Sequence, residues 1–104
     1  MGGHTVTHLP HQEIEELWAG IRHLAEERLA LIEHIVETSE TATPDPAAVE
    51  EARRAAHNLA GSLGSFHRPD GSRAARHAED ALTSPSIDRD RLMEAVTHLR
   101  AAIQ

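Results

Sequence analysis

VEEARRAAHNLAGSLGSF, the stretch from residue 49 to residue 66, places an apolar side chain at every third or fourth position. These positions are Val49, Ala52, Ala56, Leu59, Leu63 and Phe66. An α-helix makes one turn in about 3.6 residues, so this spacing gathers the side chains into one seam, as in helical bundles. The stretch therefore predicts a helix that buries one face against other helices.

On the N-terminal side, residues 11–39 have the same periodicity and predict a long first helix. Its apolar stripe, which we expect to be buried, consists of Ile14, Leu17, Trp18, Ile21, Leu24, Ala25, Leu31, Ile32, Ile35 and Val36. Arg28 interrupts the stripe, and its aliphatic stem could cover the seam while its charge reaches water. Pro44 and Pro46 end this segment, because a proline disfavours helical geometry in the residue before it, and Asp45 is a suitable N-cap for the next helix.

On the C-terminal side, residues 67–71 form a turn signal that is rich in Pro, Asp and Gly. A third helix is expected between this turn and Pro85, with a narrow apolar face of Ala74, Ala75, Ala78, Ala81 and Leu82. A fourth helix is expected from Asp88, its N-cap, with a face of Leu92, Ala95, Val96, Leu99, Ala102 and Ile103. Small residues in the third helix would allow the helices to approach closely.

The predicted fold class is all-α. Four amphipathic helices joined by short polar loops predict an antiparallel up-down four-helix bundle, which we place at residues 12–104. Residues 1–11 mix Gly, Thr, His and Pro without periodicity and are interpreted as a mobile N-terminal arm. A length of 104 residues suits one domain.

Composition and charge narrow the functional classes. The chain has no cysteine, which excludes disulfides, thiolate metal sites and cysteine nucleophiles and fits a cytoplasmic location. A formal net charge of −7 disfavours nucleic acid or a membrane surface as partner, because both attract clustered Lys and Arg. No stretch approaches the length of a membrane span. A protein partner is therefore favoured, and we expect a monomer.

One strip of the helix at residues 49–66 carries the chemistry. Arg53, His57, Ala60, Gly61 and Gly64 recur three and four residues apart beside the apolar seam. A glycine inside a helix costs about 1 kcal/mol relative to alanine, so two of them beside one histidine indicate that close approach to the imidazole matters. With small residues over the next two turns, an incoming surface could reach the ring.

The stretch AHNLAGSLGSF, residues 56–66, resembles the motif of the histidine-phosphotransfer (HPt) family. It is most similar to a subgroup with the motif His-x-Leu-Ala-Gly-Ser-Leu-Gly-Thr-Phe-Gly that continues into a Gly-Ser-Arg third helix. Residues 71–73 read Gly-Ser-Arg here, and residues 16–18, Glu-Leu-Trp, resemble the first helix of that subgroup. The resemblance thus touches three of the four expected helices.

The resemblance implies that His57 is the phospho-accepting residue of a two-component phosphorelay. Gly61 would keep the site open, while packing of the motif would fall to Leu59, Ser62, Leu63 and Phe66. The implied partners are response-regulator receiver domains, whose aspartates exchange the phosphoryl group with His57, and a sensor histidine kinase. The chain would be a phosphocarrier and not an enzyme. It would need no cofactor of its own, because the receiver supplies Mg²⁺.

Two positions depart from the family pattern. Ala60 stands where most members have a lysine, which removes a cation expected to steady the phosphoryl oxygens. Arg53 and Arg54, or else His67 or Arg76, could substitute for it. His67 itself stands where the family has a helix-ending glycine, and a left-handed conformation strains any other residue, although His is among the more tolerant.

Two other functional classes stay open from the sequence. The same bundle could be a noncatalytic interaction module that binds a receiver or kinase without phosphotransfer. Alternatively, removal of Met1 would leave a Gly-Gly-His terminus whose amine, amides and His4 imidazole could bind copper(II) or nickel(II) in a square plane. The other histidines show no spacing typical of a zinc site.

Overall fold

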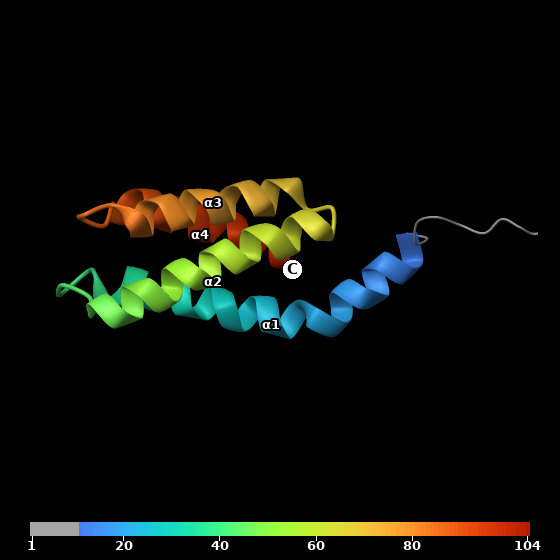
Figure 1. Cartoon of the computed structure of the whole chain (residues 1–104), viewed down its shortest axis with the longest axis horizontal. Helices are drawn as coiled ribbons and strands as arrows, with labels where there is room; N and C mark the ends of the chain where they lie inside the picture. The colour runs from blue at the N-terminus through green and yellow to red at the C-terminus, as the bar shows by residue number, and fades with distance from the viewer. Residues whose placement is uncertain (1–10) are drawn as a thin grey trace, which may run out of the picture.

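The computed structural model describes residues 11–104, which form four helices: α1 (His11–Thr38), α2 (Pro46–Ser65), α3 (Pro69–Thr83) and α4 (Arg89–Ile103). Each helix packs against two others, in the pairs α1–α2, α2–α3, α3–α4 and α1–α4. Successive helices run in opposite directions (Figure 1). The predicted up-down four-helix bundle is therefore confirmed.

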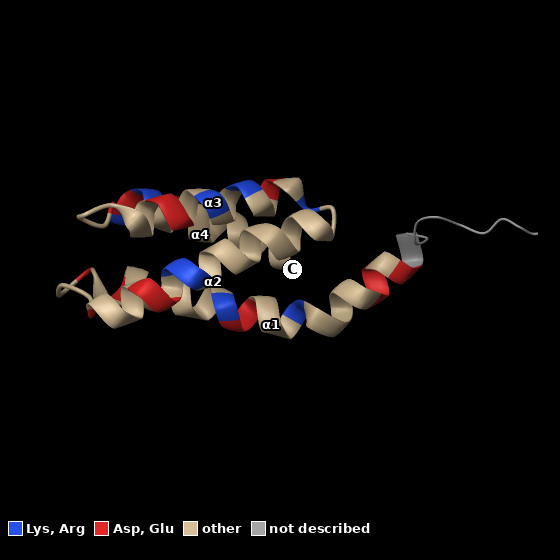
Figure 2. Ribbon diagram, in the orientation of Figure 1, with Lys and Arg blue, Asp and Glu red and all other residues tan. Residues whose placement is uncertain are grey.

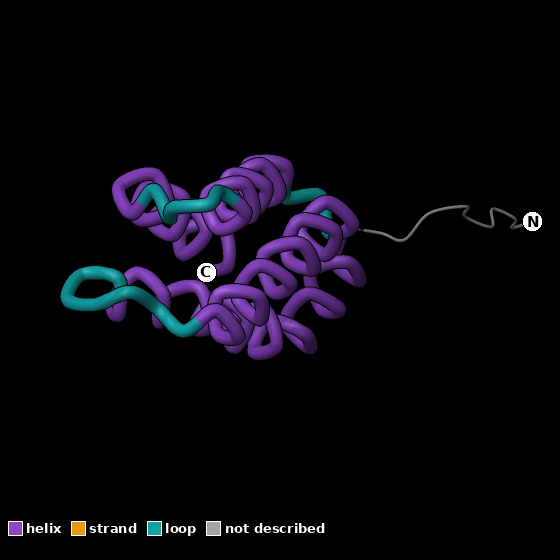
Figure 3. The backbone as a smooth tube through the Cα atoms, turned by 60° about the vertical axis from the view of Figure 1, so that its left-hand side comes forward, coloured by secondary structure: helices purple, strands orange, loops and turns teal. Residues whose placement is uncertain are grey.

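Short loops connect the helices. The α1–α2 and α3–α4 loops lie at one end of the bundle, and the short α2–α3 turn lies at the other end (Figure 3). This arrangement leaves the middle of α2, where His57 lies, far from every loop. The site is therefore carried by a rigid helix whose neighbours along the bundle are α1 and α3.

The core is built of aliphatic side chains from all four helices. The largest side chains that are almost completely buried are Ile32, Ile35, Leu59, Leu63, Leu92, Leu99 and Ile103. On α3, the small residues let α4 approach closely. A Cβ atom added at Gly71 would lie only 2.7 Å from the Cβ atom of Ala102 and 3.0 Å from Leu63 Cδ1. Only glycine fits at this crossing.

The start of α4 is capped as the sequence predicts, and the start of α2 is not. The backbone N–H of Arg91 donates a 3.1 Å hydrogen bond to the Asp88 carboxylate. Asp45 occupies the N-cap position of α2 in an extended conformation, but its carboxylate accepts no capping hydrogen bond. Pro46 at the first helical position fixes the backbone there, and the missing N–H of a proline needs no cap partner.

The turn between α2 and α3 is tighter than predicted. Pro69, Asp70 and Gly71 already belong to α3, so the predicted turn at residues 67–71 is too long. His67 has a φ of 61°. The N–H of Arg68 donates to the Leu63 carbonyl at 2.8 Å, and that of His67 donates to the Gly64 carbonyl at 3.2 Å. These two bonds form a Schellman motif, in which the left-handed residue is usually glycine.

Part of the predicted stripe on α1 is exposed. Leu17, Leu24 and Leu31 are 52%, 39% and 36% exposed, so the prediction that they are buried is wrong. Leu29, which the predicted stripe omitted, is buried. The reason is that α1 has helical neighbours only in α2 and α4, and two neighbours cover a narrower sector of a helix than its apolar residues occupy.

Within residues 11–104, no helix combines the length and the apolar character needed to cross a membrane.

Candidate functional site

His57 stands outward from the middle of α2. Its side chain is 71% exposed, whereas Leu59 and Leu63, further along the same helix, are completely buried. Burial of these leucines fixes the rotation of α2 about its axis, so the imidazole must face solvent. The ring is thus held by a rigid helix and remains accessible to a partner.

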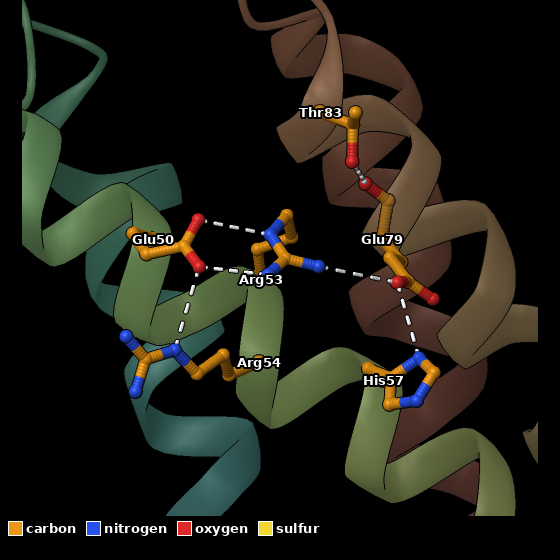
Figure 4. A network of polar contacts seen from close by, with 6 residues as sticks. All are labelled: Glu50, Arg53, Arg54, His57, Glu79 and Thr83. Carbon is orange, nitrogen blue, oxygen red and sulfur yellow. Dashed lines mark hydrogen bonds and ion pairs between the residues drawn. The ribbon is translucent and has the colours of Figure 1, made fainter.

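Glu79 of α3 reaches across to the imidazole. His57 Nδ1 lies 3.2 Å from Glu79 Oε2, and the glutamate side chain is only 23% exposed (Figure 4). An ionised carboxylate only accepts hydrogen bonds, so this contact requires the proton on Nδ1. The other ring nitrogen, Nε2, then carries the lone pair and lies on the side of the ring away from Glu79 (Figure 4).

Arg53, one turn before His57, links Glu79 to a second acid. Arg53 Nε and Nη2 donate to the two oxygens of Glu50 at 2.9 and 2.7 Å, and Nη1 donates to Glu79 at 3.5 Å. Arg54 Nε donates to Glu50 at 3.4 Å. The hydrogen bond from Arg53 is the largest cause that lowers the pKa of Glu50 to about 2, and Glu50 in turn raises the pKa of Arg53.

The cations predicted to help His57 are therefore mostly engaged elsewhere. Arg53 and Arg54 are both hydrogen-bonded to Glu50. Arg76 Nη1 donates to the Ser72 hydroxyl at 3.3 Å. His67 lies in the turn after α2. The imidazole contact that the structure shows is made by Glu79.

The residues that follow His57 on α2 leave its outer surface open. A Cβ atom added at Gly61 would meet nothing within 4 Å, and one added at Gly64 would make an ordinary 3.5 Å contact with Ser72 Oγ. Ala60 is half-buried, and its carbonyl accepts a 2.8 Å hydrogen bond from the Ser72 hydroxyl. Neither Gly61 nor Gly64 is thus required by internal packing. The second half of α2 also carries no charged residue (Figure 2).

A shallow hollow borders His57 on the α1 side. It is lined by Arg28, His57, Asn58, Gly61, Ser62, Ser65 and Phe66. The ring centroid of Phe66, one of the lining residues, lies 5.6 Å from that of Trp18 on α1. His57 therefore lies between a carboxylate from α3 and a polar hollow shared by α1 and α2.

Comparison with protein families identifies the chain. The sequence model of the Hpt domain matches residues 12–104, which is the whole bundle. The chain belongs to the Hpt domain family. Comparison with curated proteins and with solved structures gave no match. The Hpt family implies histidine phosphotransfer in two-component systems, and its members act as phosphocarriers.

Two residues near His57 in this Hpt domain were not predicted from the sequence. Glu79 lies on α3, and Ser72, on the same helix, is buried with its hydroxyl bonded to the backbone of α2. Neither belongs to a local pattern around His57. Counting outward from the turn could have found Glu79, because in two antiparallel helices residues about equally far from the turn lie opposite each other.

The predicted metal candidate, His4, lies outside the described residues. Among the side chains that the structure describes, at residues 13–104, no group of three or more His, Cys, Asp or Glu is close enough together to hold a metal ion.

Proposed function

We propose that this Hpt domain carries a phosphoryl group on His57 and exchanges it with the phosphorylated aspartates of receiver domains. The observation that carries the proposal is the state of the imidazole. Its side chain is 71% exposed, its Nδ1 is engaged by Glu79, and the next turn of α2 presents Gly61, where an added Cβ atom would meet only open space. A histidine in this setting offers one free nitrogen to an incoming group.

The transfer step follows from the tautomer. The Nε2 lone pair of neutral His57 attacks the phosphorus of the acyl phosphate and forms the N–P bond. The bond between phosphorus and the aspartate oxygen breaks, and its electron pair stays on that oxygen, which regenerates the carboxylate. The ring keeps its Nδ1 proton and gains a positive charge, which lies beside the Glu79 carboxylate. The reverse step returns the group to a receiver.

The receiver performs most of the catalysis in this scheme. Phosphoryl transfer depends on in-line placement and on neutralising charge at the equatorial oxygens, which the Mg²⁺ of a receiver supplies. The described part of this chain brings the nucleophile and a carboxylate that orients it. We therefore infer that the domain needs no cofactor of its own.

The partner surface that we propose is the outer face of α2 around His57. The absence of charged residues from the second half of α2 and the small side chains at Ala60, Gly61 and Gly64 favour a closely fitting protein surface over a charged ligand. A sensor kinase domain could use the same face. We propose that the domain acts as a monomer, because a second copy on this face would cover His57.

Incubation with a phosphorylated receiver tests the proposal. The protein should acquire acid-labile, alkali-stable phosphate, as expected of phosphohistidine, and His57→Gln should abolish the label. His77→Gln is the matched control, because His77 is an exposed histidine of α3. Label that persists in His57→Gln would overturn the assignment. Receiver binding without any label on the parent protein would instead select the noncatalytic interaction module.

A further inference from the structure

We propose that Arg28 of α1 binds the phosphoryl group on His57 and neutralises its oxygens. This inference rests on the proposed function and adds a residue to it. Arg28 is half-buried and belongs to a different helix from the other arginines near the site. It is the one arginine, lysine or acidic side chain that lines the hollow beside the imidazole.

The need for a cation follows from charge. A phosphoryl group on imidazole carries close to two negative charges at neutral pH, and here it forms a few ångströms from the carboxylate of Glu79. The protein already has a formal net charge of −7. The positive charge that the ring gains lies beside Glu79 and offsets that carboxylate, so the phosphoryl oxygens need a further cation. Without one, repulsion among the negative charges would raise the free energy of the phosphorylated state.

The other arginines near the ring already have partners. Arg53 donates to both Glu50 and Glu79, and Arg54 donates to Glu50. Arg76 is bonded to Ser72. Arg28, in contrast, makes no ion pair with any of the side chains described for residues 11–104. Its guanidinium can therefore turn to an anion without breaking an existing bridge.

The placement of Arg28 matches the free nitrogen of the ring. Nδ1 faces Glu79 on α3, and Nε2 lies on the side of the ring away from that carboxylate (Figure 4). The hollow that Arg28 lines with His57 is formed by α1 and α2, without any residue of α3. A group attached to Nε2 is thus directed away from the acid and has the Arg28 hollow beside it.

The floor of the hollow suits a phosphoryl group. Gly61 contributes no side chain, and an added Cβ atom there would meet nothing within 4 Å. The remaining polar lining consists of the Asn58 amide and the hydroxyls of Ser62 and Ser65, all of which can donate to oxygens. A planar guanidinium with several donors is the side chain best suited to complete such a set.

Chemical phosphorylation tests this role without a receiver. Potassium phosphoramidate phosphorylates imidazoles directly, and ³¹P NMR of the product reports the second pKa of the phosphoryl group. The His57 signal is assigned by its absence in His57→Gln. A nearby cation stabilises the dianion and lowers this pKa, so Arg28→Ala should raise it by roughly half a unit. Arg28→Lys should restore much of the shift, because it keeps the charge.

The matched control is Arg22→Ala. Arg22 is an exposed arginine of the same helix, is paired with Glu26 and does not line the hollow. The Arg22→Ala substitution should leave the second pKa of the phosphoryl group on His57 unchanged. With a phosphorylated receiver as donor, Arg28→Ala should slow transfer about tenfold, and Arg22→Ala should not.

The outcomes separate this inference from the proposed function. An identical phosphoryl pKa in the parent and Arg28→Ala overturns the role of Arg28, even if receivers still phosphorylate His57. A raised pKa in Arg28→Ala alone supports it, even if no tested receiver transfers. If phosphoramidate gives no signal that depends on His57, then both proposals are wrong.

Discussion

Glu79 Oε2 lies 3.2 Å from His57 Nδ1, so a carboxylate of α3 holds the exposed imidazole of α2 in one orientation. The same carboxylate accepts a 3.5 Å hydrogen bond from Arg53, whose guanidinium is anchored by Glu50. An exposed ring would otherwise rotate freely and exchange tautomers. In the function that we propose, the contact therefore prepares Nε2 as the nucleophile before any partner arrives.

Loss of Glu79 should slow transfer and mix the tautomers. In Glu79→Ala we expect ¹⁵N NMR to show a rise in the tautomer protonated at Nε2, and transfer from a receiver to fall about tenfold. Glu79→Gln keeps a hydrogen-bond acceptor, so its tautomer ratio and its transfer rate should lie between those of the parent protein and of Glu79→Ala. Glu94→Ala, an exposed change on α4, is the control. An unchanged tautomer ratio in Glu79→Ala would show that the contact does not orient the ring.

Gly61 should lower the stability of the fold but allow a receiver to approach His57. Gly61→Ala should raise the free energy of unfolding by up to about 1 kcal/mol, because an added Cβ atom meets only open space. Gly61→Gln puts a long side chain beside His57 and should slow receiver transfer at least tenfold. Gly20→Ala, also in open space but on α1, should stabilise the fold without affecting transfer. Transfer at the parental rate in Gly61→Gln would contradict the proposed docking face.

His67 is the residue in the α2–α3 turn where glycine should be better. Its φ of 61° is strained for a side chain with a Cβ atom, so His67→Gly should stabilise the protein by about 0.5 to 1 kcal/mol. Thermal unfolding should show a midpoint a few degrees higher. His77→Gly, inside α3, should lower the midpoint instead. A lower midpoint for His67→Gly would mean that its imidazole contributes more than the strain costs.

The ion pair between Glu50 and Arg53 should persist to a pH well below the usual pKa of a glutamate. The pKa of Glu50 is lowered from 4.5 to about 2, so its stabilising contribution is complete above pH 4.5 and is lost as the pH falls towards 2. A ¹³C titration of the Glu50 carboxyl should show this low midpoint, and Arg53→Leu should move it back towards 4.5. Added salt should also raise it, because the pair is exposed. A midpoint near 4.5 in the parent would mean that the pair does not persist in solution.

The helices could be predicted because their signals are local. Apolar spacing and the flanking prolines placed α2 within a residue of its observed end, and the cap at Asp88 set the start of α4. The predicted turn between α2 and α3 was too long, because Pro69 is the first residue of α3, which a turn signal alone does not reveal. The prediction that Leu17 and Leu24 are buried was wrong, because periodicity shows that a helix has an apolar face but not how many neighbouring helices cover that face.

The site could be predicted only along α2. The position of His57 and the small residues after it follow from the spacing in one helix. The contact of His57 with Glu79 depends on the register between α2 and α3, which is set by packing at Gly71 and by the Ser72 hydroxyl bond. The position of Arg28 depends similarly on how α1 packs against α2. Such register is a tertiary property without a local sequence signal.

The most direct test of the central claim is a ³¹P NMR spectrum of the protein after phosphorylation by a receiver. We predict a single phosphohistidine resonance, at the position typical of an Nε2-phosphorylated imidazole and absent from His57→Gln. A resonance typical of Nδ1 phosphorylation, or one that remains in His57→Gln, would contradict the account.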